Sequence, residues 1–298
     1  MLVVCGPTAV GKTELAAELA ERFGGEVVGA DSRQVYRGMD VATAKPSSEL
    51  RARIPHHLVD IVDPDESFDV ATWRRAALDA LADIASRDRV AIVCGGTGLY
   101  LRSLLFGLFD GPPADAALRE RLTDEERKRP GTLHSRLAEV DPSSALKIHP
   151  NDLVRIVRAL EVFETTGDTL AAWHARHGLA ERPFDALVLE VTLPREDLRR
   201  RIDVRATAMV AAGLLDETRA LGRRYDLDLK AFSAIGYREA RACLRGDLAE
   251  DALAGAVARA TRAYAKRQRV WLRGQMSTVA VPSGDLVLAL RGAGEFLG

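Results

Sequence analysis

The chain has 298 residues, of which 47% are hydrophobic and 29% are charged, and its formal net charge is −1. This length leaves room for a large core and predicts about two domains, and the composition is typical of a soluble globular protein. A nearly neutral chain has no overall attraction to nucleic acid, so a function of that kind would need a local basic patch.

The cysteines and the apolar segments indicate where the protein works. Cys5, Cys94 and Cys243 are the three cysteines, and they form no C-x-x-C pair, which favours a reducing compartment. The chain shows no signal-peptide pattern, and no apolar run reaches the roughly 18 residues of a transmembrane helix. We therefore expect a cytoplasmic protein that does not contact a membrane.

A phosphate-binding loop follows the first predicted strand, residues 2–5. The segment Gly6, Pro7, Thr8, Ala9, Val10, Gly11, Lys12, Thr13 matches G-x-x-x-x-G-K-[ST] at every fixed position. Apolar residues then recur at helical spacing from Leu15 to Phe23. Backbone N–H groups at the start of such a helix bind phosphates, Lys12 adds a charge, and the Thr13 hydroxyl can ligate Mg²⁺. The sequence therefore predicts a phosphorylated ligand without identifying it.

Strands and helices alternate over the next hundred residues. Residues 26–30 and 90–94 read as buried strands, and residues 68–86 read as an amphipathic helix between them. Strands separated by helices predict a parallel sheet with right-handed crossovers. The predicted fold is therefore α/β, with a P-loop NTPase-like parallel sheet flanked by helices.

The pattern changes at Gly111-Pro112-Pro113. From there to Pro183 the chain reads as wholly helical, and residues 186–191 return to strand character before helices at 197–221 and 249–273 and a strand at 277–281. We therefore predict a core of residues 1–111 and 184–298, interrupted by an all-helical insertion of residues 112–183.

Two polar segments follow predicted strands. Asp31 ends the second strand, where a carboxylate could act as a general base, hold Mg²⁺ or cap a helix. Gly95 and Gly96 lead to Thr97 after the third strand, which we expect beside the P-loop strand. No carboxylate ends that third strand, so the Walker-B acid typical of an ATPase is missing there.

The strongest basic feature lies near the C-terminus. Arg259, Arg262, Lys266, Arg269 and Arg273 fall on one helical stripe with no acidic residue among them. Unrelieved positive charge favours a polyanion such as RNA, although a solvated helix face remains the alternative. Two smaller arginine pairs, Arg155 with Arg158 and Arg201 with Arg205, could also bind phosphate or simply pair with neighbouring acids.

Taken together, these segments resemble the tRNA dimethylallyltransferases, also called tRNA isopentenyltransferases. The resemblance covers nearly the whole chain. The most particular segments are residues 31–40, with the pattern Asp-Ser-x-Gln-x-Tyr-x-Gly-Met-Asp, and residues 95–100, Gly-Gly-Thr-Gly-Leu-Tyr. Other matching segments are the P-loop and residues 43–46, 57–60, 149–152, 158–163, 235–238 and 266–268.

The resemblance implies an enzyme that transfers a dimethylallyl group from dimethylallyl diphosphate to N6 of the adenine just 3′ of a tRNA anticodon. In this interpretation the P-loop and Mg²⁺ hold the diphosphate, Asp31 accepts the N6 proton, and Thr97 contacts the reaction centre. Lys12, with Arg201 and Arg205 as further candidates, stabilises the leaving diphosphate. We expect no zinc, because the C-x-x-C and paired histidines of zinc-finger relatives are missing, and we expect a monomer.

The resemblance also implies that the insertion grips the anticodon stem-loop of the tRNA, whose adenine must leave its stack. The implied RNA contacts are Asp31, Ser32, Arg33, Gln34, Thr97, Arg119, Val154, Arg155, Ile156, Val157, Arg158, Ser233, Ala234, Ile235, Gly236, Tyr237, Arg238, Lys266, Arg267, Gln268, Arg269 and Arg273. The alternative functions are a P-loop kinase for a small metabolite and a non-catalytic RNA-binding module switched by a nucleotide.

Overall fold

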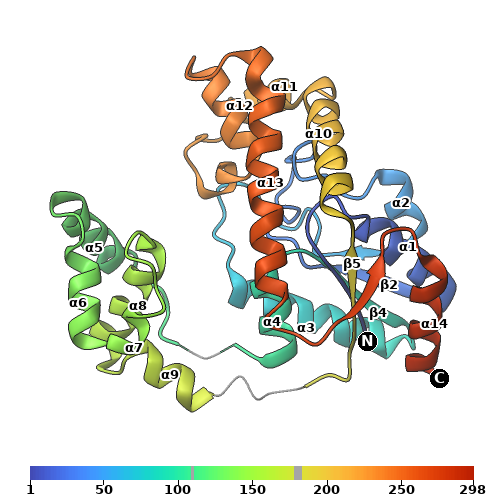
Figure 1. Cartoon of the computed structure of the whole chain (residues 1–298), viewed down its shortest axis with the longest axis horizontal. Coiled ribbons are helices and arrows are strands. Elements are labelled where there is room, and N and C mark those ends of the chain that lie inside the picture. The colour runs from blue at the N-terminus through green and yellow to red at the C-terminus, as the bar shows by residue number, and fades with distance from the viewer. Residues whose placement is uncertain (109–110, 178–182) are drawn as a thin grey trace. The chain divides into compact units, whose positions relative to one another are not determined.

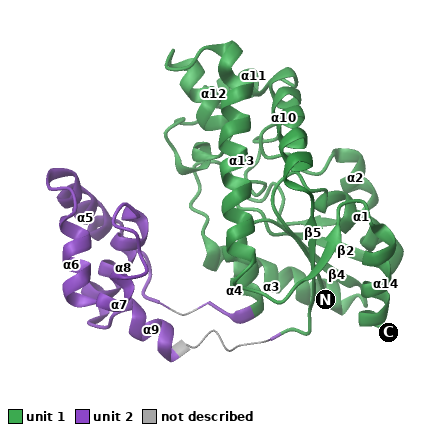
Figure 2. Ribbon diagram, in the orientation of Figure 1, with its two compact units in different colours: residues 1–105, 184–298 green, residues 106–183 purple. Residues whose placement is uncertain are grey.

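The computed structural model describes residues 1–108, 111–177 and 183–298, which form two compact units (Figures 1 and 2). Unit 1 consists of Met1–Leu105 and Phe184–Gly298, and unit 2 is Phe106–Pro183. Unit 2 thus begins at Phe106 and unit 1 resumes at Phe184, whereas the sequence-based prediction places the insertion at residues 112–183. No helix among the described residues is both long and apolar enough to span a bilayer.

Unit 1 is built on a six-stranded sheet in the order β3-β2-β4-β1-β5-β6, and all its strand pairs are parallel. The strands are β1 (Leu2–Cys5), β2 (Gly25–Gly29), β3 (His56–His57), β4 (Val90–Gly95), β5 (Leu187–Thr192) and β6 (Val279–Pro282). The predicted α/β fold with a parallel sheet is confirmed. The central strand β1 is fully buried, because its Leu-Val-Val-Cys run is apolar on both faces.

Helices cover both faces of this sheet (Figure 1). α1 (Lys12–Phe23) packs on β1, β2 and β4 and against α14 (Leu286–Leu297), whereas α3 (Val70–Ser86) packs on β2 and β4. The remaining helices of the first segment are α2 (Ser48–Arg53) and α4 (Gly98–Phe106). The crossover from β1 to β2 through α1 and the crossover from β3 to β4 through α3 run in opposite directions along the sheet. Right-handed connections therefore place α1 and α3 on opposite faces.

The segment between β5 and β6 is helical. It contains α10 (Arg195–Ala211), α11 (Leu214–Leu221), α12 (Tyr237–Leu244) and α13 (Leu253–Leu272), with short 3₁₀ turns at Lys230–Ser233 and Glu250–Ala252. The single helix expected over 197–221 is two helices, because Gly213 adopts a φ of 90° between them. α10 and α13 lie side by side (Figure 1).

Unit 2 is all-helical in its described part, with α5 (Ala116–Lys128), α6 (Thr132–Val140), α7 (Pro142–Ala145), α8 (Leu153–Thr166) and α9 (Leu170–His177). Leucine, isoleucine and valine side chains of α5, α6 and α8 form its own core. Residues 109–110 and 178–182, which belong to the predicted first core segment and the predicted insertion, lie outside the described residues.

A buried carboxylate organises unit 2. Glu161 of α8 is fully buried and accepts hydrogen bonds from Arg119 (2.8 Å), Arg158 (2.6 Å) and the Asp115 N–H (2.7 Å). Arg158 also donates to the Pro112 carbonyl (2.9 Å). Burial opposes ionisation of Glu161, but the bonds from Arg119 and Arg158 outweigh it and hold the pKa below its usual range. This network ties α5 and the preceding chain to α8.

Replacing Glu161 with glutamine is expected to destabilise unit 2 by about 1–3 kcal/mol, because two part-buried arginines lose their shared anion. Because the folded-state pKa is lowered, Glu161 contributes fully above its unfolded pKa and loses that contribution as the pH falls through the folded value. Hydrogen exchange of the amides in residues 116–166, measured against an Asp168→Asn control in the exposed Arg176 pair, checks the effect. Equal exchange in both variants would contradict it.

Candidate functional site

The P-loop turns between β1 and α1 as the sequence predicts. Gly6 and Gly11 adopt φ values of 141° and 97°, and a Cβ on Gly6 would lie 2.7 Å from the Val191 carbonyl oxygen. No side chain caps the start of α1, so its first N–H groups remain for an anion. The loop is therefore shaped by glycines where the backbone needs them, and its helix start is suited to phosphate.

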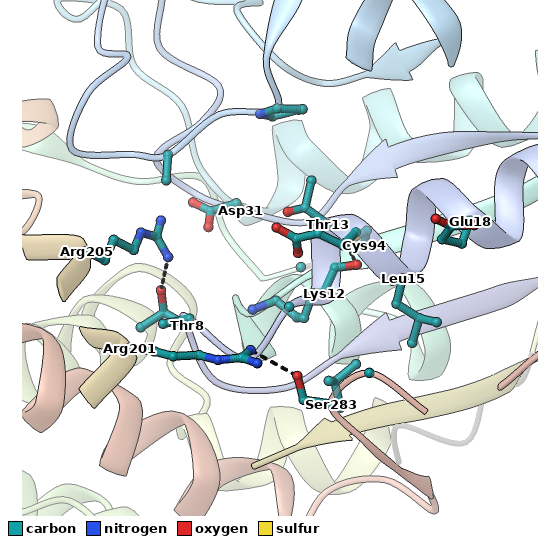
Figure 3. Close-up of a pocket in the computed structure, with 18 of the residues that line it drawn as sticks. Thr8, Lys12, Thr13, Leu15, Glu18, Asp31, Cys94, Arg201, Arg205 and Ser283 are labelled. Atoms are coloured by element: carbon teal, nitrogen blue, oxygen red, sulfur yellow. Dashed lines mark hydrogen bonds between the residues drawn. The ribbon is translucent and has the colours of Figure 1, made fainter. Parts of the chain in front are cut away.

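A cavity of about 1120 Å³, here called the P-loop cavity, opens in front of this loop. Figure 3 shows Lys12, Arg201 and Arg205 approaching the same space from α1 and α10. Lys12 Nζ donates to the Pro7 carbonyl (2.8 Å), Arg201 to Ser283 Oγ (3.0 Å) and Arg205 to Thr8 Oγ1 (3.3 Å). The pair Arg201 and Arg205, distant from the P-loop in sequence, is thus brought to it by the packing of α10.

Burial shapes the charge of these cations. Burial lowers the pKa of Lys12, although Cys94 and Asp31 nearby act in the opposite direction. Burial likewise lowers the pKa of Arg205, against the effect of Asp31 and Glu14. Cations that lose water without a full set of carboxylate partners gain from an incoming anion. An anion bound in the P-loop cavity would therefore stabilise the charged forms of Lys12 and Arg205.

Asp31 lies just beyond β2, at the edge of this cavity. Its Oδ1 accepts hydrogen bonds from the N–H groups of Arg33 (2.8 Å) and Gln34 (3.4 Å). Within the described part of the chain, Oδ2 has no hydrogen-bond partner. One carboxylate oxygen thus shapes the turn, as the capping alternative proposed, while the other stays free for a ligand.

A second cavity of about 260 Å³, here called the side cavity, meets the first. Thr8, Asp31, Thr43 and Arg205 line both. Apolar side chains of α10 and α13 form much of the side cavity, and Tyr264 and Arg267 add polar groups. Burial first, and the charge of Asp31 second, raise the pKa of Tyr264 to about 12, so its phenol keeps its proton at neutral pH. Asp31 therefore stands where two substrates could meet.

Thr97 lies next to this junction without lining either cavity. Its Oγ1 accepts a hydrogen bond from the Ser32 N–H (3.0 Å) and so joins the turn after β4 to the turn after β2. Because β2, β4 and β1 are neighbours in the sheet, Asp31, Thr97 and the P-loop all lie at the carboxyl edge of adjacent strands, as expected.

The residues assigned to RNA differ in exposure. The side chains of Ile156, Val157, Ala234 and Tyr237 are buried, and their contact with RNA stays a prediction. Gln268 is also buried, because α13 packs that face on the P-loop. Arg119 and Arg158 are bound to Glu161, and their contact with RNA stays a prediction. The other residues assigned to RNA are mostly exposed, namely Val154, Arg155, Ser233, Arg238, Lys266, Arg267 and Arg273. Ile235 and Arg269 are half-buried, and Gly236 is buried.

The turn after Asp31 is held by its own side chains. Arg33 donates to the Lys230 carbonyl (3.1 Å) and to Ser233 Oγ (3.2 Å), and Gln34 Nε2 donates to the Thr43 and Ala44 carbonyls (3.1 and 3.0 Å). Both residues were expected to contact RNA, and both are engaged in shaping the cavity wall. Gln34 lines the P-loop cavity, and Arg33 lines the side cavity with Ser32.

Sequence reasoning missed two residues of the P-loop cavity. Ser283 follows β6 and donates to the Val10 carbonyl (2.7 Å). Its hydroxyl also accepts from Arg201, so Ser283 links Arg201 to the P-loop. Lys45 is almost buried and donates to the Tyr36 carbonyl (2.6 Å) and to Asp40 (2.7 Å), and it also pairs with Asp60. The only signal for Ser283 is its place at the carboxyl end of the last predicted strand.

The basic stripe on α13 is less uniform than its sequence suggests. Arg262 pairs with Asp203 of the neighbouring α10, whereas Arg259, Lys266 and Arg273 are exposed. The helix itself carries no acid in this stretch, and the acid comes from a helix packed beside it. The exposed members of the stripe keep an uncompensated positive face.

Comparison with known proteins adds independent information. The family model "IPP transferase" matches residues 34–275. The tRNA dimethylallyltransferase of Geobacter sulfurreducens is 50% identical over 275 residues, which cover 92% of this chain and 88% of that protein. The enzyme of the same name from Anaeromyxobacter sp. (strain K) is 50% identical, with coverage of 98% and 96%.

Solved structures resemble the chain along its whole length. A tRNA isopentenylpyrophosphate transferase from Bacillus halodurans superposes with a TM-score of 0.74 at 34% identity, covering 99% of this chain and 96% of its own. A eukaryotic dimethylallyltransferase acting on tRNA superposes with a TM-score of 0.84 at 28% identity, covering 100% of this chain and 79% of its own.

Proposed function

The chain belongs to the IPP transferase family, and from this premise we propose how its site works. The protein is a tRNA dimethylallyltransferase, which is a prenyltransferase. We propose that it transfers a dimethylallyl group from dimethylallyl diphosphate to N6 of the adenine 3′-adjacent to the anticodon of certain tRNAs and releases diphosphate. The observation that carries the mechanism is the meeting of the P-loop cavity and the side cavity at Asp31 and Thr8.

The two cavities give each substrate its place. The donor diphosphate occupies the P-loop cavity against the start of α1, and the adenine occupies the side cavity after leaving its stack. N6 then attacks C1 of the dimethylallyl group, the C1–O bond to diphosphate breaks, and Oδ2 of Asp31 accepts the N6 proton. Lys12, Arg201 and Arg205 face the oxygen atoms that gain charge. Alignment and charge stabilisation supply most of the catalysis, because diphosphate is already a good leaving group.

Mg²⁺ fits this site through the ligands it prefers. Among the described residues, no three His, Cys, Asp or Glu side chains come together as a ready-made metal site. Mg²⁺ bound to a polyphosphate needs few protein ligands, since substrate oxygens and water complete its shell. We propose that the hydroxyl of Thr13, which lines the P-loop cavity, would hold the ion together with the diphosphate. The ion would supply charge neutralisation for the leaving group there.

The RNA is proposed to contact both units. In unit 1 the exposed cations of α13 border the side cavity through Arg267, which lines it. In unit 2 the exposed Val154 and Arg155 at the start of α8 remain the best candidates of the predicted segment. Phosphate contacts of this kind position an RNA without reading its sequence. We propose that the protein acts in the cytoplasm as a monomer on the anticodon stem-loop.

The direct experiment supplies the protein with dimethylallyl diphosphate, Mg²⁺ and unmodified tRNA. Nucleoside mass spectrometry should detect N6-dimethylallyladenosine, and omission of Mg²⁺ should suppress it. A tRNA whose adenine next to the anticodon is replaced by guanine is the matched control and should give no product. Absence of product from the native tRNA would reject the assigned reaction, and product from the control tRNA would reject the assigned position.

Salt dependence tests the contact between α13 and RNA. Each phosphate contact releases counterions, so replacing Lys266 and Arg269 by glutamine is expected to reduce the slope of log affinity against log salt by about 1 to 2 units. The matched control is Arg262→Gln, because its charge is already paired with Asp203. The measurement is tRNA affinity at a series of salt concentrations. An unchanged slope in the double variant would contradict the RNA contact and favour the alternative, that the stripe is an ordinary solvated helix face.

A further inference from the structure

Gln268 is a polar side chain in a buried place. It belongs to α13, and only 8% of its surface is exposed, although Arg267 and Lys266 beside it are exposed. A buried amide is costly unless both of its ends are hydrogen-bonded. Both the oxygen and the nitrogen of the Gln268 amide therefore need hydrogen-bond partners.

Both partners lie in loops that form the site. Gln268 Oε1 accepts a hydrogen bond from the Thr8 N–H (2.9 Å), and Nε2 donates to the Gly96 carbonyl (2.8 Å). Thr8 belongs to the P-loop after β1, and Gly96 belongs to the turn after β4. One side chain from a distant helix thus joins the two loops at the carboxyl edge of the sheet.

The close fit of α13 on this turn explains two of its glycines. A Cβ on Gly96 would lie 2.3 Å from Gln268 Nε2, and a Cβ on Gly98 would lie 2.3 Å from the Trp271 ring. Both distances are far shorter than a van der Waals contact. The Gly-Gly-Thr-Gly sequence is therefore needed for the approach of this helix, in addition to any contact with a ligand.

The two joined loops carry groups on either side of the junction. The Thr8 hydroxyl accepts a hydrogen bond from Arg205 (Figure 3), and Arg205 lines both cavities. The residue after Gly96 is Thr97, whose hydroxyl holds the Ser32 N–H next to Asp31. If the Gln268 hydrogen bonds were lost, the P-loop, which faces the diphosphate, could move relative to Asp31, the base. The P-loop and the turn that holds Asp31 would each keep their own structure.

We propose that Gln268 is a positioning residue for the transfer reaction, which keeps the P-loop and the Asp31–Thr97 region in register. This inference rests on the proposed function and assigns Gln268 no contact with substrate or RNA. It replaces the expectation that Gln268 binds tRNA. Reactions between two bound substrates depend steeply on their alignment, so the loss should appear in the chemical step.

The first test is Gln268→Met, which keeps the length of the side chain and removes both hydrogen bonds. We expect the single-turnover rate to fall about 10- to 100-fold, while the dissociation constants for dimethylallyl diphosphate and for tRNA change by less than about threefold. The matched control is Gln275→Met, the same change at an exposed position, with a rate equal to that of the wild type. A normal rate in Gln268→Met, or a loss explained entirely by weaker tRNA binding, would overturn the inference.

The second test uses a double-mutant cycle. Gly96→Ala should push the Gln268 amide away without altering α13 and should lower the rate by a similar factor. Because both changes break one contact, Gly96→Ala added to Gln268→Ala should cost less than about threefold more. Full additivity of the two losses would overturn the inference. The cycle also covers the case in which Gln268→Met folds poorly, because Gly96→Ala tests the same contact while residue 268 remains glutamine.

A third readout does not depend on activity. The Thr8 amide is expected to exchange with solvent at least about tenfold faster in Gln268→Met, with the β1 amides unchanged, and equal exchange would overturn the contact itself. If wild-type protein forms no modified nucleoside, the proposed function fails while this exchange result stands on its own. If the wild type is active and the variants are as well, the positioning role fails alone.

Discussion

Asp31→Asn is expected to lower the rate of dimethylallyl transfer by about 10²–10⁴-fold while leaving tRNA affinity nearly unchanged. Asparagine keeps an oxygen that can accept the Arg33 and Gln34 N–H groups, so the turn that Asp31 shapes is preserved. What it loses is the second carboxylate oxygen, which the protein leaves without a partner at the junction of the two cavities. The measurement is a single-turnover rate with donor and tRNA both in excess of their dissociation constants.

Asp31→Ala separates the two roles of this residue. It removes the turn-capping oxygen as well as the base, so we expect the same loss of rate together with reduced thermal stability. A capping oxygen contributes about 1 kcal/mol. A near-normal single-turnover rate in Asp31→Asn would reduce Asp31 to a structural residue, and another acceptor for the N6 proton would have to be found.

Lys12→Ala is expected to lower kcat/KM by roughly 10²–10³-fold, equivalent to about 3–4 kcal/mol of transition-state stabilisation. Lys12 lies in the cavity with its amine on the Pro7 carbonyl, and its charge develops its full effect only when the leaving diphosphate becomes more negative. Because this contact strengthens in the transition state, the loss should fall mainly on kcat. Steady-state kinetics with varied dimethylallyl diphosphate distinguish the two parameters.

The matched control for Lys12 is its cavity neighbour Arg201, which is exposed and held by Ser283. Arg201→Ala should cost less than Lys12→Ala, because a solvated charge is screened more strongly. An unchanged kcat in Lys12→Ala would contradict the role assigned to the P-loop. Vigorous hydrolysis of ATP without tRNA would instead favour a kinase or ATPase. We expect none, because β4 ends in Gly95 with no carboxylate beside the P-loop.

The sequence determined those parts of the molecule whose signal is local. The P-loop is specified by eight consecutive residues, and β1 by four buried apolar residues. Two other signals are equally local. Glycine permits the left-handed backbone at its own position, and apolar periodicity marks α3 through residues three and four apart. Asp31 and the Gly96–Thr97 turn could be placed at one sheet edge because parallel strands end together.

Short or irregular elements were not determined in this way. β3 has two residues and pairs only with β2, so it carries too little pattern to be recognised. The break between α10 and α11 at Gly213 lies within a segment whose residue pattern predicts one continuous helix. α14 also went unrecognised, although its apolar face packs on α1 and β5. For β3 and α14 the deciding contact is with a distant segment, whereas the break at Gly213 comes from its own left-handed backbone.

The tertiary structure alone decided which polar residues are free to act. Arg262 carries the same charge as Lys266, but packing of α10 against α13 gives it Asp203. Gln268 lies among basic residues in the sequence, but α13 directs its side chain toward the P-loop, where it bonds to Thr8 and Gly96. Arg119 and Arg158 belong to different helices, and the fold brings both to the buried Glu161. Residue types and spacing identify which groups can do chemistry. Charge pairing and desolvation depend on partners that can lie far away in the sequence, such as 59 residues for Arg262 with Asp203 and 260 residues for Gln268 with Thr8.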